Sequence, residues 1–168
     1  NEFQLEKGNY IILTLHRPSN VDEENSLIDL LKGIDQMVGN KKVIFPIHPR
    51  TKAILGEQNL SLKNILLVEP QGYLNFMYLI KNSFAVITDS GGISEETTVL
   101  GIPCFTLRTT TERPETIEIG TNHLIGTSIK NLEKIFSDFL KNGAKKAGIP
   151  ALWDGKASDR IISILLEK

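Results

Sequence analysis

The residues with the clearest chemical potential lie in a glycine-rich turn in the middle of the chain. Residues 84–87 are apolar and predict a buried strand, while residues 93–100 predict a short helix. Between them stand Ser90, Gly91 and Gly92. Glycines have no Cβ, so backbone N–H groups can approach an anion, and the first turn of a helix offers unpaired donors. The turn therefore predicts a site for phosphate.

Two carboxylates, Glu95 and Glu96, follow one turn into the predicted helix. They would repel a phosphate, but carboxylates suit the hydroxyl groups of a ribose, as in dinucleotide-binding folds. We therefore expect a nucleoside diphosphate at the turn, with Glu96 on its ribose. The alternative is plain turn chemistry, in which Asp89 or Ser90 caps the helix. The local pattern alone does not decide between the two.

A second polar loop follows the next apolar run, residues 103–107, and carries Arg113. Loops at the carboxyl ends of neighbouring parallel strands converge on one crevice, where ligands bind. If the two strands are neighbours, Ser90 and Arg113 come from adjacent loops, and the arginine can grip a phosphate with its planar fork of donors. The alternative is a solvated loop whose arginines pair with Glu112 and Glu115.

Histidine and cysteine offer few other candidates. His16 ends the first apolar run, residues 10–15, at the carboxyl edge expected for Ser90, where it can donate to a phosphate or carry protons. It can equally be a polar residue that caps a loop. Cys104 lies in an apolar strand and reads as a small buried hydrophobe. The histidines and the single cysteine lack metal-ligand spacing, so we expect no metal and no cofactor.

Apolar runs alternate with helical periodicity along the whole chain. Strands are predicted over residues 10–15, 43–47, 65–68, 84–88, 103–107 and 123–126. Helices are predicted over residues 26–38, 51–55, 73–80, 93–100, near Pro114, over 129–140, and over 158–166 with Ser158 or Asp159 as its cap. Nearly continuous apolar strands between helices predict an α/β fold, a three-layer Rossmann-like parallel sheet with helices on both faces.

Length and charge limit the function classes. The 168 residues fit one domain. With 19 basic and 20 acidic residues, the chain lacks the excess of positive charge that is typical of nucleic-acid-binding proteins. No run is long and apolar enough for a membrane span, and no basic stretch precedes an apolar one as in a signal peptide, so a cytoplasmic protein is expected. The chain lacks an initial methionine, and residues 1–8 read as a linker within a longer protein.

Several spaced motifs together resemble one family. They are Leu15-His16-Arg17-Pro18, Pro70-Gln71-Gly72-Tyr73-Leu74-Asn75-Phe76, Asp89-Ser90-Gly91-Gly92-Ile93-Ser94-Glu95-Glu96, Gly101-Ile102-Pro103, Thr111-Glu112-Arg113-Pro114-Glu115, Gly120-Thr121 and Trp153-Asp154-Gly155-Lys156-Ala157-Ser158. The chain resembles, over essentially its whole length, the C-terminal half of non-hydrolysing UDP-N-acetylglucosamine 2-epimerases. The resemblance implies that residues 1–168 are a single UDP-binding domain, one half of a two-domain GT-B-type architecture with the nucleotide in the interdomain cleft.

The resemblance also implies roles for particular residues. It places His16 in a catalytic motif and assigns UDP binding to Gln71, Phe76, Ser90, Gly91, Gly92, Glu96 and Arg113. Phe76 either covers the uracil ring or fills the core. Arg17 and His48 match a pair that in some bacterial members helps to hold a second, activating UDP-sugar, although the flanking residues depart from that version. Ser19 stands where the family usually carries an acid.

The activity implied is interconversion of UDP-GlcNAc and UDP-ManNAc for cell-surface polysaccharide biosynthesis. In the family, UDP leaves by anti-elimination to give a 2-acetamidoglucal and then adds to the other face. Most proton-handling carboxylates lie in the N-terminal domain, so this chain alone should be inactive; the full protein is expected to be a homodimer. Two other readings stay open: the UDP-binding half of a GT-B-type glycosyltransferase, and a non-catalytic UDP-sugar-binding module.

Overall fold

The centre of the molecule is a parallel sheet, seen in a computed structural model that describes residues 5–55 and 61–166. Within those residues the sheet has six strands in the order β3-β2-β1-β4-β5-β6. They are β1 (Tyr10–Thr14), β2 (Lys42–Pro46), β3 (Ile65–Val68), β4 (Ala85–Thr88), β5 (Cys104–Thr106) and β6 (Asn122–Leu124). The order reverses direction between β1 and β4, and such a switch point opens a ligand crevice at the carboxyl ends of the strands.

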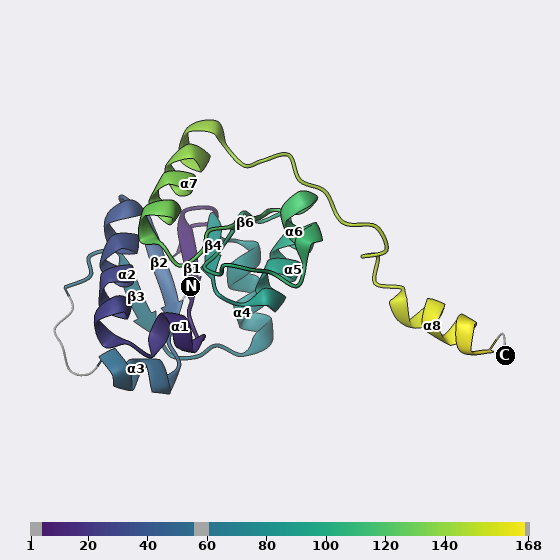
Figure 1. The fold of residues 1–168 in the computed structure, drawn as a ribbon, viewed down its shortest axis with the longest axis horizontal. Helices are drawn as coiled ribbons and strands as arrows, with labels where there is room; N and C mark the ends of the chain where they lie inside the picture. The colour runs from purple at the N-terminus through teal and green to yellow at the C-terminus, as the bar shows by residue number, and fades with distance from the viewer. Residues whose placement is uncertain (1–4, 56–60, 167–168) are drawn as a thin grey trace.

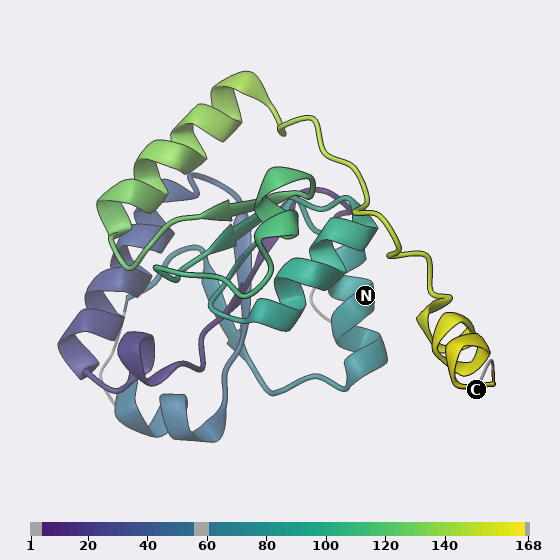
Figure 2. The ribbon, with the colours of Figure 1, turned by 45° about the vertical axis from the view of Figure 1, so that its right-hand side comes forward.

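Helices cover both faces of the sheet (Figures 1 and 2). They are α1 (Pro18–Val21), α2 (Glu24–Met37), α3 (Pro49–Leu55), α4 (Tyr73–Lys81), α5 (Gly91–Leu100), α6 (Pro114–Glu118), α7 (Ile129–Asn142) and α8 (Ala157–Leu166). Helices α2 and α7 pack on one face, and α4 and α5 on the other. The three-layer α/β architecture predicted from the alternating pattern is confirmed.

The pattern arises because the strands bury both of their faces. In β1, Ile11 and Leu13 join the core under α2 and α7, whereas Tyr10 and Ile12 join the core under α4 and α5. Strands buried on both sides read as continuous apolar runs rather than alternating ones. The predicted strands and helices are all present, with ends displaced by a few residues. Helix α1, a single short turn, was not predicted.

The C-terminal segment departs from the sheet. Helix α8 stands at the end of an extended stretch, away from the other helices (Figure 1), and buries none of its described residues. The prediction that Ser158 or Asp159 caps it is wrong, since both lie inside the helix. The Asp154 carboxylate instead accepts a hydrogen bond from the Lys156 N–H (3.0 Å) in the turn just before it.

The N-terminal linker and the absence of a membrane span were two further predictions from the sequence. The first four residues of the linker predicted over 1–8 lie outside the described residues. Across residues 5–55 and 61–166, no helix has the length and apolar character that a membrane span requires.

Candidate functional site

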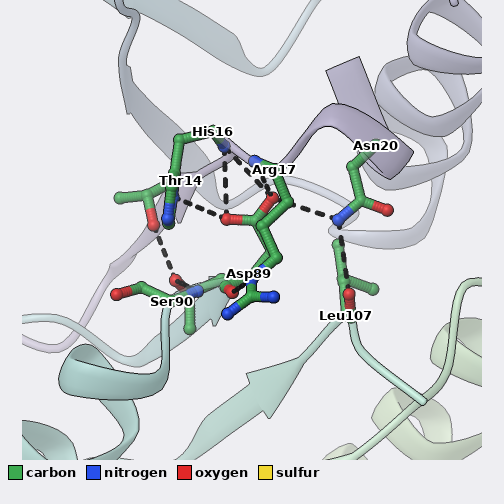
Figure 3. Close-up of polar contacts among 8 residues, drawn as sticks. Thr14, His16, Arg17, Asn20, Asp89, Ser90 and Leu107 are labelled. Atoms are coloured by element: carbon green, nitrogen blue, oxygen red, sulfur yellow. Dashed lines mark hydrogen bonds and ion pairs between the residues drawn. The ribbon is translucent and has the colours of Figure 1, made fainter. Parts of the chain in front are cut away.

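A buried carboxylate, Asp89, organises the carboxyl edge of the sheet (Figure 3). Its oxygens accept hydrogen bonds from the backbone N–H groups of His16 (3.1 and 3.2 Å) and Arg17 (2.9 Å). The Asn20 side-chain amide donates to it as well, at 3.0 Å. The His16 ring places Nδ1 2.8 Å from Oδ1 of the same carboxylate. Asp89 therefore joins the turn after β1 to the turn after β4.

The pairing of the central strands brings these turns level. Thr14 lies opposite Thr88 in the register of β1 and β4, and their hydroxyl oxygens are 2.7 Å apart. The Thr88 hydroxyl also accepts the backbone N–H of Ser90 at 3.0 Å. Asn20 donates a further, longer hydrogen bond (3.3 Å) to the carbonyl of Leu107, just beyond β5. Three loops, following β1, β4 and β5, are thus tied into one unit.

The glycine-rich turn leads into α5 as predicted. Ser90 occupies the N-cap position with an extended backbone, but its side chain makes no capping hydrogen bond. Ser90 is therefore the N-cap residue, one of the two expected, whereas the Asp89 side chain is engaged by the turn after β1. A Cβ added to Gly92 would meet no atom within 4 Å. The fold's own packing therefore does not require glycine there, and the exposed turn is open to an approaching ligand.

Arg113 comes from the loop after β5 and reaches this helix. Its Nε donates to the Glu95 carboxylate in α5, and its Nη1 donates to the Glu112 carbonyl at 3.0 Å. Pairing with Glu95 raises the pKa of Arg113, which stays charged. The prediction that the loops after β4 and β5 lie next to each other is confirmed. Arg113, however, forms its ion pair with Glu95 and not with Glu112 or Glu115. Those two acids had been the partners expected of a solvated loop.

The second arginine of this loop behaves differently. Arg108 is buried and forms a two-pronged pair with the Glu112 carboxylate, with N–O distances of 2.8 and 2.6 Å. The hydrogen bonds from Arg108 lower the pKa of Glu112 to about 2. For Arg108, the local pairing expected of a loop arginine is confirmed. Its guanidinium is engaged in holding the loop.

A buried polar chain fixes the backbone at Arg113. The Thr116 hydroxyl donates to the Arg113 carbonyl (2.8 Å) and accepts from the Asn122 amide (3.1 Å). The Asn122 side-chain oxygen in turn accepts from the Thr106 hydroxyl at 2.6 Å. Thr106, Thr116 and Asn122 are all buried, so the start of α6 is anchored to both β5 and β6.

The two adjacent glutamates of α5 have different partners. Glu95 faces Arg113, whereas Glu96 accepts a hydrogen bond from the Tyr73 hydroxyl (3.3 Å). The negative charge of Glu96 raises the pKa of that phenol. Successive helical residues point about 100° apart, which accounts for the divergence. Beside Glu96 lies a groove of about 330 Å³ lined by Tyr73, Met77, Glu95, Glu96, Val99, Leu100 and Trp153.

Other predicted site residues are placed less directly. Phe76 is partly buried and packs against the core under α4 and α5, and its contact with uracil stays a prediction. Gln71 donates to the carbonyl of Glu69 at 2.8 Å, within its own loop. His48 Nδ1 accepts the Arg50 N–H at 3.2 Å. Within the described ranges, no hydrogen bond or ion pair joins His48 to the other member of the expected activator pair.

Arg17 is held by the same buried residue, Asp89. Its Nε donates to the Asp89 carbonyl (3.1 Å), and its side chain lines a hollow of about 170 Å³. The lining residues of that hollow are Arg17, Ser19, Leu107, Arg108, Thr109, Thr110 and Thr127. Ser19 thus lies beside two arginines and brings no negative charge to them.

Two further reactive side chains, Cys104 and His123, pack within the fold. Burial raises the pKa of the Cys104 thiol to about 11, so the sulfur remains a protonated thiol rather than a nucleophile. The His123 ring stacks on Phe105 with 5.2 Å between ring centroids. Among residues 5–55 and 61–166, no group of three or more His, Cys, Asp or Glu side chains is placed to hold a metal ion.

Comparison with known proteins decides the family. The family model for UDP-N-acetylglucosamine 2-epimerase matches residues 1–166. The chain belongs to the UDP-N-acetylglucosamine 2-epimerase family. A curated UDP-N-acetylglucosamine 2-epimerase of Methanocaldococcus jannaschii is 44% identical to it over 163 residues, which is 93% of this chain and 44% of the relative.

Solved structures agree with the 2-epimerase assignment. The crystal structure of the Methanocaldococcus jannaschii UDP-GlcNAc 2-epimerase in complex with UDP-GlcNAc and UDP superposes with a TM-score of 0.78 at 42% identity, over 95% of this chain and 45% of that one. An Escherichia coli heptosyltransferase with ADP, at 10% identity over 79% of this chain and 45% of its own, has a TM-score of 0.57 and shares the fold alone. The chain spans less than half the length of these relatives.

Sequence reasoning did not find the two residues that organise this 2-epimerase domain, Asp89 and Asn20. Asp89 was expected only as a helix cap, and Asn20 was not considered. The available signal was an acid placed directly after a buried strand, while His16 and Arg17 followed another strand of the same predicted parallel sheet. Such residues meet at the carboxyl edge when their strands are neighbours.

Proposed function

We propose that this chain is the UDP-binding, C-terminal domain of a two-domain 2-epimerase that interconverts UDP-GlcNAc and UDP-ManNAc. The observation that carries the proposal is that Arg113 reaches α5, the helix that begins at the glycine-rich turn and carries Glu96, at the switch point of the sheet. A ligand with a diphosphate and a ribose is complementary to these groups. The family membership of the chain points to the same ligand.

Each part of the ligand has a matching group. The backbone N–H groups of Gly91 and Gly92, together with the Ser90 hydroxyl, would hold the diphosphate at the N-terminus of α5. Glu96 would accept hydrogen bonds from the ribose hydroxyls, and Gln71 and Phe76 would contact the uracil. His16, in the turn after β1, would contact the ligand from the side opposite the glycine-rich turn.

The elimination and re-addition of UDP require a protein that keeps the diphosphate bound. UDP leaves the sugar by elimination and then returns to the other face, so it must stay bound between the two steps. Arg113 and the backbone N–H groups would stabilise the charge that develops on the departing phosphate oxygen. The remaining acid–base groups would come from an N-terminal domain of the same protein, and the working unit would be a cytoplasmic homodimer.

An assay of the complete protein tests this function. With UDP-GlcNAc and no acceptor, we expect UDP-ManNAc to accumulate until the two sugars reach equilibrium. A glycosyltransferase would instead release UDP only when an acceptor is added, and a UDP-sugar-binding module would bind the ligand without converting it. Either of those results would reject the epimerase assignment.

Gly92→Ala should separate ligand binding from stability. A Cβ at Gly92 meets open space, and alanine is favoured over glycine inside helices, so the free energy of unfolding should stay level or rise by about 0.5–1 kcal/mol. The added methyl group would keep a phosphate from the N–H groups, so UDP should bind about tenfold more weakly, the equivalent of one charged hydrogen bond. Thermal unfolding and titration calorimetry measure the two quantities.

Gly148→Ala is the matched control, because its Cβ also finds room (3.7 Å from Ile119 Cγ2) but the position lies in the segment after α7. That variant should keep the UDP affinity of the parent. Unchanged UDP affinity in Gly92→Ala would mean that phosphate does not approach this turn.

A further inference from the structure

The Asp89 carboxylate is satisfied mainly by uncharged hydrogen-bond donors. Its side chain is fully buried, and the groups that contact the carboxylate directly are two backbone N–H groups, the Asn20 amide and the His16 ring. A buried carboxylate is costly unless hydrogen bonds satisfy it. The Arg17 Nε donates to the Asp89 backbone carbonyl, not to its carboxylate. Of the groups that donate to the carboxylate, only the His16 ring can carry a full positive charge.

The contact also fixes which nitrogen of His16 carries a proton. An ionised carboxylate can only accept hydrogen bonds, so Nδ1, at 2.8 Å from Oδ1, must be the donor. The hydrogen bond made by one ring nitrogen determines the state of the other. Nε2 is then the nitrogen turned away from Asp89, on a side chain that is 57% exposed.

We propose that Asp89 is a positioning residue, which holds His16 as the Nδ1–H tautomer and so leaves Nε2 as the ring atom that meets the ligand. The ligand role rests on the proposed function, whereas the tautomer does not. Because the same carboxylate holds the backbone N–H groups of His16 and Arg17, the position of the ring and that of the turn are fixed together. Only a hydrogen bond and the position of one proton are involved, and no covalent bond between heavy atoms forms or breaks.

The shape of the site explains why aspartate is needed. The oxygen of an asparagine would keep the Oδ2 position, where the Arg17 N–H and the Asn20 amide donate. Its NH₂ would then take the Oδ1 position and face Nδ1 of His16, and two donors cannot pair. A glutamate would add a methylene group to a fully buried position. Asp89→Asn therefore keeps the size of the side chain while it removes the acceptor that selects the tautomer.

Nitrogen NMR of histidine-labelled protein tests the tautomer directly. The spectrum is recorded at about pH 9, above the ordinary titration range of histidine. The His16 signals are those lost in His16→Gln. We expect a protonated Nδ1 and an unprotonated Nε2 for His16 in the parent protein. A protonated Nε2 in the parent protein would overturn the proposal without any variant having to fold.

Variants then separate positioning from general damage. Asp89→Asn should lose the Nδ1–H preference, while Asn20→Ala, which removes another donor from the same carboxylate, should keep it. In UDP titrations, Asp89→Asn and His16→Gln should each weaken binding about tenfold, and the double variant should be no weaker than the worse single one. Additive losses would show that Asp89 acts independently of His16, against the proposal. A parent protein with the expected tautomer and no UDP affinity would reject the proposed function alone.

Discussion

Replacing Arg113 with alanine should weaken UDP binding roughly ten- to a hundredfold, the range for losing hydrogen bonds to a charged group, and should leave uridine almost unaffected. Both ligands share the base and the ribose, and only UDP brings the diphosphate that Arg113 would grip. The loss has a second source in this structure: without Arg113, the Glu95 carboxylate stands unpaired beside the phosphates. Titrations of both ligands at several salt concentrations measure the effect, and the salt dependence for UDP should flatten.

Arg160→Ala is a suitable control for the change in net charge. Arg160 is similarly half-exposed and also pairs with a carboxylate, that of Asp154, but it lies in the C-terminal helix. Its loss should leave both affinities unchanged. If Arg113→Ala weakened uridine as much as UDP, the arginine would be shaping the loop and not contacting phosphate.

Glu96→Ala should weaken UDP by a similar factor, but through the ribose. A carboxylate that accepts hydrogen bonds from hydroxyls contributes about 1.5–3 kcal/mol, or roughly ten- to a hundredfold in affinity. A dideoxyribose analogue of UDP should bind both proteins almost equally, because the hydroxyls that Glu96 contacts are already missing. Calorimetry of the two ligands with the two proteins provides the comparison.

Two further variants identify the cause of that loss. Tyr73→Phe removes the hydroxyl that contacts Glu96 but keeps the ring, and it should cost little, because Glu96 itself stays. Glu95→Gln should act in the opposite direction: it releases Arg113 from a competing carboxylate, so UDP should bind about two- to fivefold more tightly, in keeping with an exposed ion pair. A larger, hydroxyl-dependent loss from a Glu95 variant would show that the ribose lies on Glu95.

The scaffold of the site could be predicted because strong, simple signals specify it. Strands such as β4 bury both faces and read as unbroken apolar runs, and the parallel arrangement follows from their alternation with helices. Once β4 and β5 are neighbours, Ser90 and Arg113 must emerge at the same edge. These conclusions depend on the whole apolar pattern and tolerate errors of a few residues at element ends.

The partners of individual side chains could not be predicted, because they are far apart in sequence. The alternative to a phosphate contact for Arg113 was pairing with an acid of its own loop, yet it reaches Glu95, 18 residues earlier, since α5 and α6 lie side by side. Asp89 was considered only as one of two candidate caps for the helix that follows it, a common role for an aspartate there. Its true partners lie 69 to 73 residues earlier, on the turn after β1.

The central position of β1 has a consequence for how the chain folds as it is made. Strands β1, β2 and β3 are adjacent in the sheet and can pair as soon as they are synthesised, but the other edge of β1 must wait for β4. Domains commonly begin to fold during synthesis, and long-range strand pairing is slow. Residues 16–20 therefore stay without their carboxylate until Asp89 emerges, and the ligand crevice forms only when the second half of the sheet closes onto the first.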